Sequence, residues 1–291
     1  MPTLRAVKNR IRSVVSTRRI TKAMEMVAAA KLRRAQQRVE QAKPYAQKLD
    51  EMLGHLAAAS SSEIRHPFFE ERPVKKRTLV VLSSDRGLCG SFNTNILRRT
   101  DIWLAENRGS SDIELVTVGK RGNDYYKRRR WPIVGFYGDW GGVPDFDRVR
   151  QMVHMLSDRF VSGQTDEIVL IYTKFLSMVR YRVMVDRYLP VARPETHDER
   201  LQGLQREYIF EPSAEEIYAS LMPSYAVTKM VTAIVESFAS EHGSRMIAMG
   251  NATTNAGEMI DTLTLDYNKA RQAQITKELL EVVAGADALK G

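Results

Sequence analysis

The sequence has few of the residues that form cross-links, metal sites or membrane spans. Cys89 is the only cysteine, which excludes an internal disulfide and a zinc site built from cysteines. The five histidines form neither an H-x-x-x-H nor an H-E-x-x-H pair, so we predict no metal site. No apolar stretch approaches the roughly 20 residues that span a bilayer, and the charged segment that follows Met1 predicts no signal peptide.

Helix-breaking residues are also scarce at both ends of the chain. Residues 3–43 contain neither proline nor glycine, and no proline follows Pro223. We therefore predict a helix over residues 4–58, which Pro44 kinks but does not end, because the apolar spacing stays in phase across it. A second helix is expected to start at Ser213, which opens an S-x-x-E capping box, and to restart at Pro223.

Each predicted helix carries one narrow apolar stripe, here called a seam, with the spacings of three and four residues that are typical of a coiled coil. The first seam consists of Leu32, Ala35, Val39, Ala42, Ala46, Leu49, Leu53 and Leu56. The second seam has one slip after its fifth member and consists of Ala256, Ile260, Leu263, Tyr267, Ala270, Ile275, Leu279, Val282, Ala286 and Leu289. Neither helix could bury its seam alone, so we expect the two seams to pack on each other.

Three glycines share one face of the second helix. Gly243, Gly250 and Gly257 lie seven residues apart, and each destabilises a helix by about 1 kcal/mol relative to alanine. Such a stripe would let another backbone approach closely and could soften the helix, although three glycines could also fall at this spacing by chance.

Positive charge is concentrated in the first helix. Residues 1–48 hold thirteen lysines and arginines against Glu25 and Glu40, a net charge of +11, whereas the remaining residues sum to −2. This concentration suits nucleic acid, an anionic membrane or an acidic protein surface, or it could simply keep the helix solvated. The cations go round the helix instead of lining one face, which counts against insertion into a nucleic-acid groove.

The middle of the chain alternates short apolar runs with helical segments. The expected strands are residues 78–84, 113–118, 133–137 and 167–173. One expected helix starts at about residue 93, and two others span residues 123–130 and 146–161. This alternation indicates βαβ units and a mostly parallel sheet with helices on its faces. Residues 178–188 should add an edge strand that ends at Pro190. The predicted divisions are an N-terminal helix at 1–60, an α/β domain at 74–190, a connecting loop at 191–212 and a C-terminal helix at 213–291.

Two segments of the α/β region have some features of phosphate-binding sites. The turn at residues 85–90 follows a strand and opens a helix, but it lacks the Walker and three-glycine patterns, so we interpret it as a tight βα turn. The run KRRR at 127–130 could bind phosphate, or it could be a solvated helix end with cations next to the negative end of its dipole. We predict no catalytic residue and no cofactor.

The last turns of the second helix are apolar on every side. Between Leu279 and Leu289, Glu281 and Asp287 are the only charged or polar side chains. A helix that is apolar all round is normally surrounded. Because one partner helix could cover only part of it, we expect this tip to lie in a sleeve built by other chains, the alternative being packing against the chain's own body.

Four segments, in order along the chain, resemble the gamma subunit of F-type ATP synthases. They are ITKAMEMVAAAK at residues 20–31, SSDRGLCG at 83–90, ASEH with RM at 239–246, and YN, RQ, IT and EL at 267–279. The resemblance covers nearly the whole chain, and four ordered segments are far more specific than a single glycine motif.

The resemblance implies a mechanical part without an active site. In that family the terminal helices form an antiparallel coiled coil inside a ring of alternating alpha and beta subunits. A Rossmann-like α/β domain lies below it on the membrane-embedded c-ring, together with the epsilon subunit, in one copy per complex. The residues expected to contact the catalytic subunits are Met24, Arg245, Arg271, Gln272 and Thr276. The residues expected to form a bearing at the tip are Leu279, Val282, Val283 and Leu289.

Two further expectations come from the comparison with that family. The chain has no inserted segment with a cysteine pair, so the thiol regulation of chloroplast relatives should be absent. No presequence is visible, which favours a bacterial complex at the cytoplasmic face of the plasma membrane over the matrix side of the mitochondrial inner membrane. The competing function is a nucleic-acid-binding protein that uses its basic first helix and binds more weakly as salt rises.

Overall fold

The computed structural model describes residues 3–59, 66–178, 180–192 and 214–288. The elements follow in the order α1 (Leu4–Ala59), the short 3-10 helix η1 (Pro67–Phe69), β1 (Lys76–Leu82), α2 (Phe92–Asn107), β2 (Asp112–Val118), α3 (Lys120–Arg128), β3 (Ile133–Tyr137), α4 (Phe146–Val161), β4 (Glu167–Ser177), β5 (Arg180–Leu189) and α6 (Ala214–Ala288). The predicted strands and helices are all present in the predicted order, with ends that differ by a few residues. Ser213 and most of the predicted connecting loop lie outside the described residues.

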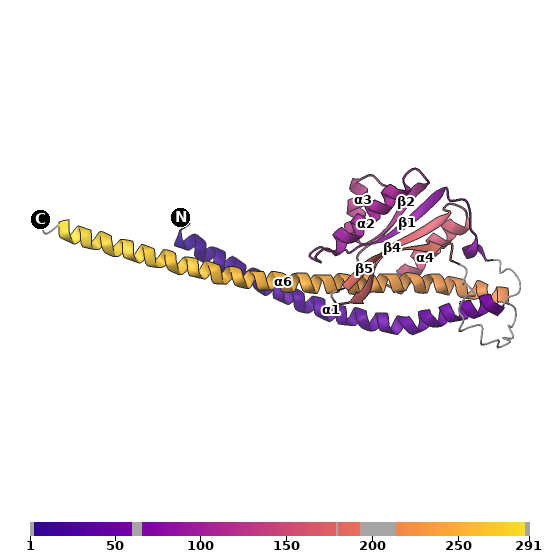
Figure 1. Ribbon diagram of the computed structural model, residues 1–291, viewed down its shortest axis with the longest axis horizontal. Helices are drawn as coiled ribbons and strands as arrows, with labels where there is room; N and C mark the ends of the chain where they lie inside the picture. The colour runs from indigo at the N-terminus through magenta and orange to yellow at the C-terminus, as the bar shows by residue number, and fades with distance from the viewer. Residues whose placement is uncertain (1–2, 60–65, 179, 193–213, 289–291) are drawn as a thin grey trace. The chain divides into compact units, whose positions relative to one another are not determined.

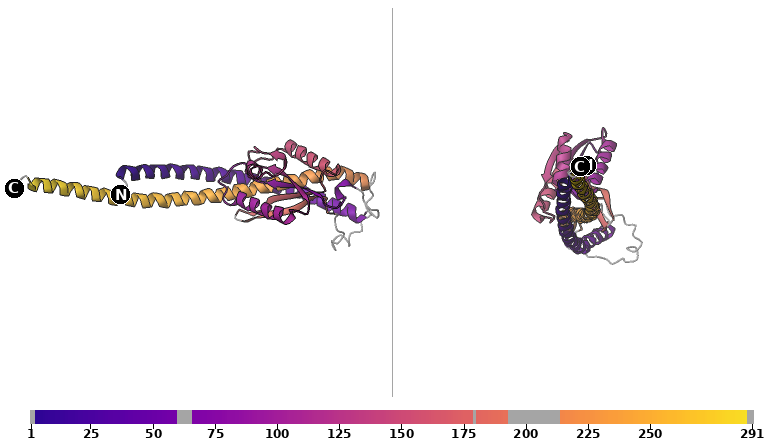
Figure 2. Two further views of the ribbon diagram at one scale, coloured as in Figure 1. Left: turned by 90° about the horizontal axis from the view of Figure 1, so that it is seen from above. Right: turned by 90° about the vertical axis from the view of Figure 1, so that its left-hand side faces the viewer.

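The chain divides into two compact units, and each long helix contributes to both. Unit 1 contains residues 1–28 and 245–291, and unit 2 contains residues 29–244. Within each unit, α1 and α6 run side by side in opposite directions, as Figures 1 and 2 show. The predicted antiparallel pairing of the terminal helices, with an α/β region between them in the sequence, is therefore confirmed.

Unit 2 is built on a five-stranded sheet in the order β3-β2-β1-β4-β5. The strands β1 to β4 are parallel to one another, and β5 pairs antiparallel with β4 at one edge. The central strand β1 is buried on both faces, as expected for a strand of continuous apolar residues in a parallel sheet. The predicted edge strand is thus β5.

Helices cover both faces of this sheet. On one face, Leu79 and Val81 of β1 pack with Ile96 and Trp103 of α2 and with Tyr126 of α3, and Figure 1 shows α2 and α3 next to each other there. Successive strand residues point to opposite faces, so the buried Val80 and Leu82 face the other side. α4 lies on that side, where Met155 and Val116 both approach Gly135.

The first seam is buried in unit 2. Its apolar members Leu32, Leu49, Leu53 and Leu56 are between 2% and 4% exposed, although the helix face opposite them is solvated. Pro44 lies inside α1 and on its exposed side, so the helix continues past it. The prediction that Pro44 does not end the helix is confirmed.

The predicted restart of the second helix at Pro223 is wrong. Pro223 lies inside α6, which is one continuous helix of 75 residues. A proline removes one backbone donor and crowds the preceding turn. Here its ring is exposed, and the buried Met222 and Ala226 on either side hold the helix against the rest of unit 2. Packing on both sides therefore outweighs the local cost of the proline.

The three glycines of α6 all face α1. A Cβ added to Gly243 would lie 3.5 Å from the Met178 carbonyl oxygen and 3.8 Å from a methyl carbon of Leu32. In unit 1 a Cβ on Gly250 or Gly257 would lie 3.7 Å from Glu25 or Arg18. The α1 residues at these contacts are themselves spaced by seven. The stripe therefore marks the pairing face of α6, but with ordinary van der Waals distances that would also accommodate alanine.

Tyr218 gives unit 2 a measurable dependence on alkaline pH. Its hydroxyl donates a hydrogen bond of 2.7 Å to the Leu53 carbonyl, its ring packs edge-on against Phe69, and burial raises its pKa to about 12. An unfolded tyrosine ionises near pH 10, so the stability that this group contributes is present below pH 10 and is lost as the pH rises towards 12. We expect Tyr218→Phe to lower the free energy of unfolding by about 1 kcal/mol at neutral pH and to make its fall above pH 10 less steep.

Urea unfolding at a series of pH values measures both effects. Tyr45→Phe is the control, because Tyr45 lies on α1 and is 56% exposed. Equal pH profiles for the two variants would contradict the assignment.

The glycine contacts predict a gain in stability. Gly250→Ala and Gly257→Ala should each raise the free energy of unfolding by up to about 1 kcal/mol, because alanine fits and favours the helix. Thermal unfolding followed by circular dichroism would show a higher midpoint. The control is Gly119→Ala, since Gly119 has a φ of 90° and an added Cβ would lie 2.2 Å from the Ser83 carbonyl oxygen. A lower midpoint for the two α6 variants would mean that the helices pair more tightly than these distances indicate.

Candidate functional site

The candidate site is the outer helix pair, which we define as residues 4–28 of α1 and 245–288 of α6 in unit 1. The hydroxyls of Thr253 and Thr21 are 2.8 Å apart, and Gly250 and Gly257 face Glu25 and Arg18. In these contacts residue n of α1 lies opposite about residue 275 − n of α6. Since α1 begins at Leu4, its first residue lies opposite about residue 271.

The pairing of the two helices therefore stops where α1 begins, opposite about residue 271 of α6. Ala256 is buried, and the next members of the second seam, from Ile260 to Ala270, are half-buried. Every residue from 271 to 285 is exposed. The expectation that the two seams pack on each other is wrong, because the first seam lies in unit 2 and the second in unit 1. The register places Ala256 to Ala270 opposite about residues 5–19 of α1, and Ile275, Leu279 and Val282 lie beyond the start of that helix.

The predicted contact residues lie along the outer helix pair in two groups. Met24 and Arg245 are half-buried, in the paired segments of α1 and α6. Arg271, Gln272 and Thr276 are exposed at the start of the unpaired segment, where the Thr276 hydroxyl donates to the Gln272 carbonyl at 3.0 Å. The structure does not gather the five residues into one cluster.

The predicted tip residues form an uncovered apolar surface. Leu279, Val282 and Val283 are 62%, 70% and 56% exposed, and Leu289 lies outside the described residues. Leu280, at 64% exposed, belongs to the same surface and was missed by the sequence reasoning, although the all-round apolar pattern already included it. Large exposed apolar patches mark interaction sites.

α1 adds apolar residues that the sequence reasoning did not single out. Ile20, Met26 and Val27 are each more than half exposed, within the segment ITKAMEMVAAAK. The sequence indicates these three residues because they do not follow the three- and four-residue spacing of the apolar stripe on α1. Large apolar residues off the seam of a two-helix pair point to a third surface.

The cations of α1 add a strong field to the outer helix pair. Lys22 pairs with Glu25 at 3.1 Å. Among the residues that the structure describes, no carboxylate lies within ion-pair distance of Arg5, Lys8, Arg10, Arg12, Arg18 or Arg19. A surface with this field favours acidic partners.

In the turn at residues 85–90, the Asp85 carboxylate lies at the amino-terminal end of α3. Asp85 accepts hydrogen bonds of 3.0 to 3.1 Å from the backbone N–H groups of Lys120, Asp139 and Trp140, including that of the first residue of α3. Ser84 is held by Asn93 and the Arg86 carbonyl. The prediction that this segment connects a strand to a helix is confirmed.

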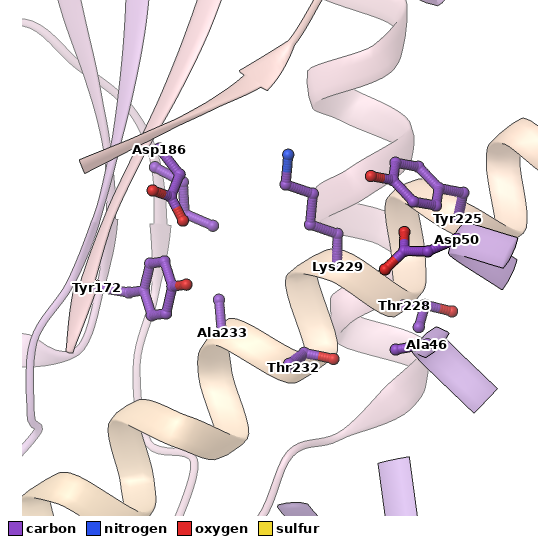
Figure 3. A pocket seen from close by; sticks show the side chains of 10 residues that line it. Ala46, Asp50, Tyr172, Asp186, Tyr225, Thr228, Lys229, Thr232 and Ala233 are labelled. Atoms are coloured by element: carbon purple, nitrogen blue, oxygen red, sulfur yellow. The ribbon is translucent and has the colours of Figure 1, made fainter. Parts of the chain in front are cut away.

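Unit 2 contains a pocket of about 200 Å³ that is lined by both apolar and charged side chains. Figure 3 shows Asp50 of α1, Tyr172 of β4, Asp186 of β5, and Tyr225 and Lys229 of α6 around it. Burial lowers the pKa of Lys229 and raises that of Asp50, while the charges of both aspartates favour the protonated ammonium. Its Nζ donates to the Arg187 carbonyl at 2.9 Å. We interpret the charged side chains around this pocket as a cluster that links α1, α6 and the edge of the sheet.

Neither a metal centre nor a membrane span is found in the described ranges. No three histidine, cysteine or acidic side chains there are grouped closely enough to hold an ion. Of the helices described, none combines the length and apolar character needed to cross a bilayer.

Curated relatives match the chain over its entire length. The ATP synthase gamma chains of Moorella thermoacetica and Desulforamulus reducens are 47% and 46% identical over 290 residues, which is all of this chain and all of each relative. The ATP synthase gamma chain of Brevibacillus brevis is 42% identical over 286 residues and 98% of both chains.

Solved structures of ATP synthases also contain chains that resemble this one. A chain of the Tetrahymena thermophila mitochondrial ATP synthase central stalk and c-ring is 27% identical, with a TM-score of 0.59, over 80% of this chain and 99% of the other. A chain of the Euglena gracilis mitochondrial ATP synthase has the same fold, with a TM-score of 0.64 and 18% identity, over 98% and 94% of the two chains. The family model described as ATP synthase matches residues 3–289. This chain belongs to the ATP synthase gamma chain family.

Proposed function

We propose that this chain is the rotating central shaft of an F-type ATP synthase and carries torque between a membrane ring and a catalytic head. The observation that carries the proposal is the end of helix pairing near residue 271, which leaves an exposed apolar helix end. A shaft needs an end that other chains hold, and a rigid pair of helices that transmits torque.

The tip would be the bearing. Leu279, Val282 and Val283 share one face of the helix, and Leu280 extends the apolar surface to a neighbouring face. A surface this broad is removed from water most completely when several chains surround it. We infer that the alternating alpha and beta subunits form this sleeve, and that Leu289 continues the same surface.

The rest of the outer helix pair would act on the catalytic subunits. Met24 and Arg245 lie on the paired segments, and Arg271, Gln272 and Thr276 lie just beyond them. We propose that these residues contact loops of the alpha and beta subunits in turn, and that the cations of α1 face acidic loops of the beta subunits. Arginine suits such contacts because its planar guanidinium binds carboxylates with two hydrogen bonds.

Rotation of this surface could change nucleotide affinity because its faces differ. The α1 side carries the exposed Ile20, Met26 and Val27 together with most of the cations, whereas the α6 side carries the carboxylates of Glu258, Asp261 and Asp266. A subunit that meets each side in turn is stabilised in different states, and a shift in affinity requires such differential contacts. The chain itself would need no active site.

The remaining partners would be the epsilon subunit and the c-ring, with one copy of the chain per complex. The relatives named above are bacterial ATP synthase gamma chains. We therefore propose peripheral attachment to the cytoplasmic side of a bacterial plasma membrane, through the membrane-bound complex.

Purification of the tagged chain from its host tests the assignment. We expect alpha and beta subunits to be recovered with it after nuclease treatment, and the chain alone to have no ATPase activity. Recovery of nucleic acid alone, lost on nuclease treatment or in high salt, would support the nucleic-acid-binding alternative instead.

Removal of the tip tests the bearing. Deletion of residues 279–291 should lower coupled ATP synthesis in inverted membrane vesicles and lower the thermal stability of the complex, because apolar contacts with the sleeve are lost. The control is Lys277→Gln with Glu281→Gln, which removes an exposed ion pair of 3.6 Å and keeps every apolar residue. Unchanged synthesis and stability in the deletion variant would refute the bearing.

A further inference from the structure

An open cleft of about 870 Å³ lies in unit 2 at the amino-terminal ends of β1 and β2. Three separate segments line it. They are Val74 and Lys75 before β1, residues 108–113 at the start of β2, and residues 129–131 after α3. The outer helix pair contributes nothing to this cleft.

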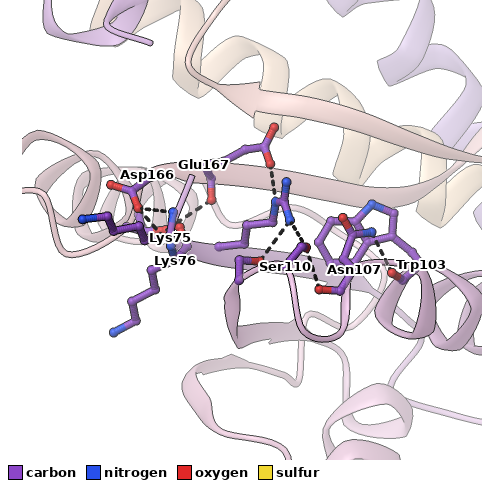
Figure 4. A network of polar contacts seen from close by, with 10 residues as sticks. Lys75, Lys76, Trp103, Asn107, Ser110, Asp166 and Glu167 are labelled. Carbon is purple, nitrogen blue, oxygen red and sulfur yellow. Dashed lines mark hydrogen bonds and ion pairs between the residues drawn. The ribbon is translucent and has the colours of Figure 1, made fainter. Parts of the chain in front are cut away.

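One wall of the cleft is fixed by a polar network, shown in Figure 4. Arg77 donates hydrogen bonds of 3.0 Å to the hydroxyls of both Ser110 and Ser111, and its Nε donates to Glu167 at 2.6 Å. The Ser110 hydroxyl in turn donates to the Asn107 carbonyl at 2.9 Å. Gly109, with a φ of 95°, makes the turn in this loop. The loop that carries Arg108 is thus held in place by contacts that do not involve the Arg108 side chain.

The opposite wall is the end of α3. The Arg129 guanidinium lies 3.5 Å from the centre of the Tyr125 ring, a cation–π contact that positions it. Arg130 has a φ of 60°, and its N–H donates to the Lys127 carbonyl at 3.1 Å, so the chain turns sharply there. Trp131 follows in the cleft wall and is half-buried.

The charge of the cleft is unbalanced. Lys75, Arg108, Arg129 and Arg130 line it together with a single carboxylate, Asp112. In the described residues, none of these four cations has an ion-pair partner, whereas their neighbours Lys76 and Arg77 pair with Glu114 and Glu167. Cations at a helix end are explained by the helix dipole, but Lys75 and Arg108 come from other segments, so the dipole does not explain this cluster.

We propose that this cleft binds a phosphate ester. Arginine guanidinium groups recognise phosphate oxygens with paired hydrogen bonds, and three arginines and a lysine surround one space. The volume exceeds that of a phosphate group alone, and Trp131, Val74 and Ile113 provide apolar surface beside the cations. The ligand class is therefore a phosphate attached to an apolar or aromatic group. Both a nucleotide and an anionic phospholipid headgroup have this chemistry.

The test compares two variants of the full chain that each lose two positive charges. Arg108→Gln with Arg130→Gln removes cations from the cleft, and neither side chain makes a described hydrogen bond or ion pair that folding would lose. The matched control is Lys127→Gln with Arg128→Gln, which changes exposed cations of α3 outside the cleft. Thermal unfolding verifies that both variants fold.

Two sets of probes distinguish the sources of the ligand. Calorimetric titration uses inorganic phosphate, pyrophosphate, AMP and ATP, and cosedimentation uses phosphatidylglycerol vesicles with phosphatidylcholine vesicles as the blank. The cleft variant should bind at least one probe about tenfold more weakly than the unchanged chain, and the control less than about twofold more weakly. A difference with the soluble probes indicates a small phosphate ester, and a difference with the vesicles alone indicates a lipid headgroup.

Two results would overturn the proposal. One is equal weakening in both variants, which would mean that the probes respond to net charge, including that of α1. The other is no binding of any probe at millimolar concentration. Neither result would affect the shaft assignment, because the cleft is separate from the outer helix pair.

Discussion

The fold depends on the need of two long helices to cover apolar faces that neither could bury alone. An isolated helix of either kind would leave Leu32, Leu49 and Leu53, or their counterparts on α6, in water, and most helical stability in proteins comes from packing. Because α1 and α6 are at opposite ends of the sequence, their pairing also closes the chain around the α/β region. The sheet does not have to bring the ends together.

The sheet in turn is completed by the helix pair. The Ser237 hydroxyl of α6 accepts a hydrogen bond from the Thr173 amide, the Ser240 hydroxyl donates to the Thr173 carbonyl, and the Tyr188 hydroxyl donates to the Ala226 carbonyl. These bonds tie β4 and β5 to α6. An antiparallel edge strand held in this way is protected from pairing with other chains. Burial of the hydroxyl raises the pKa of Tyr188, which keeps it a donor.

The elements could be predicted from the sequence to within a few residues, because the apolar runs of β1 and β2 and the missing helix breakers of α1 are local signals. Two expectations failed because they depended on distant contacts. Pro223 stays inside α6 because buried neighbours on both sides hold the helix, and Ile275 lies beyond the start of α1 because the partner helix is too short to reach it. The lengths of two paired helices can be compared only once their register is known.

The candidate site was only partly predictable for the same reason. The all-round apolar tip is visible in the sequence, since its pattern is local, whereas Met24 and Arg245 came from the family resemblance alone. The basic cleft could not be found, because Lys75, Arg108 and Arg130 come from three segments that meet only after the sheet has formed. The run at residues 127–130 suggested a phosphate site, and two of its four cations line the cleft.

The end of α1 near residue 271 of α6 also has a mechanical meaning. A single helix bends and twists more readily than two helices packed along a shared face, so elastic compliance in the outer helix pair is concentrated in the segment that follows Ala270. Under load, that segment would deform first and return the stored work when the load is released. The position at which α1 begins thus determines where the more compliant segment of α6 starts.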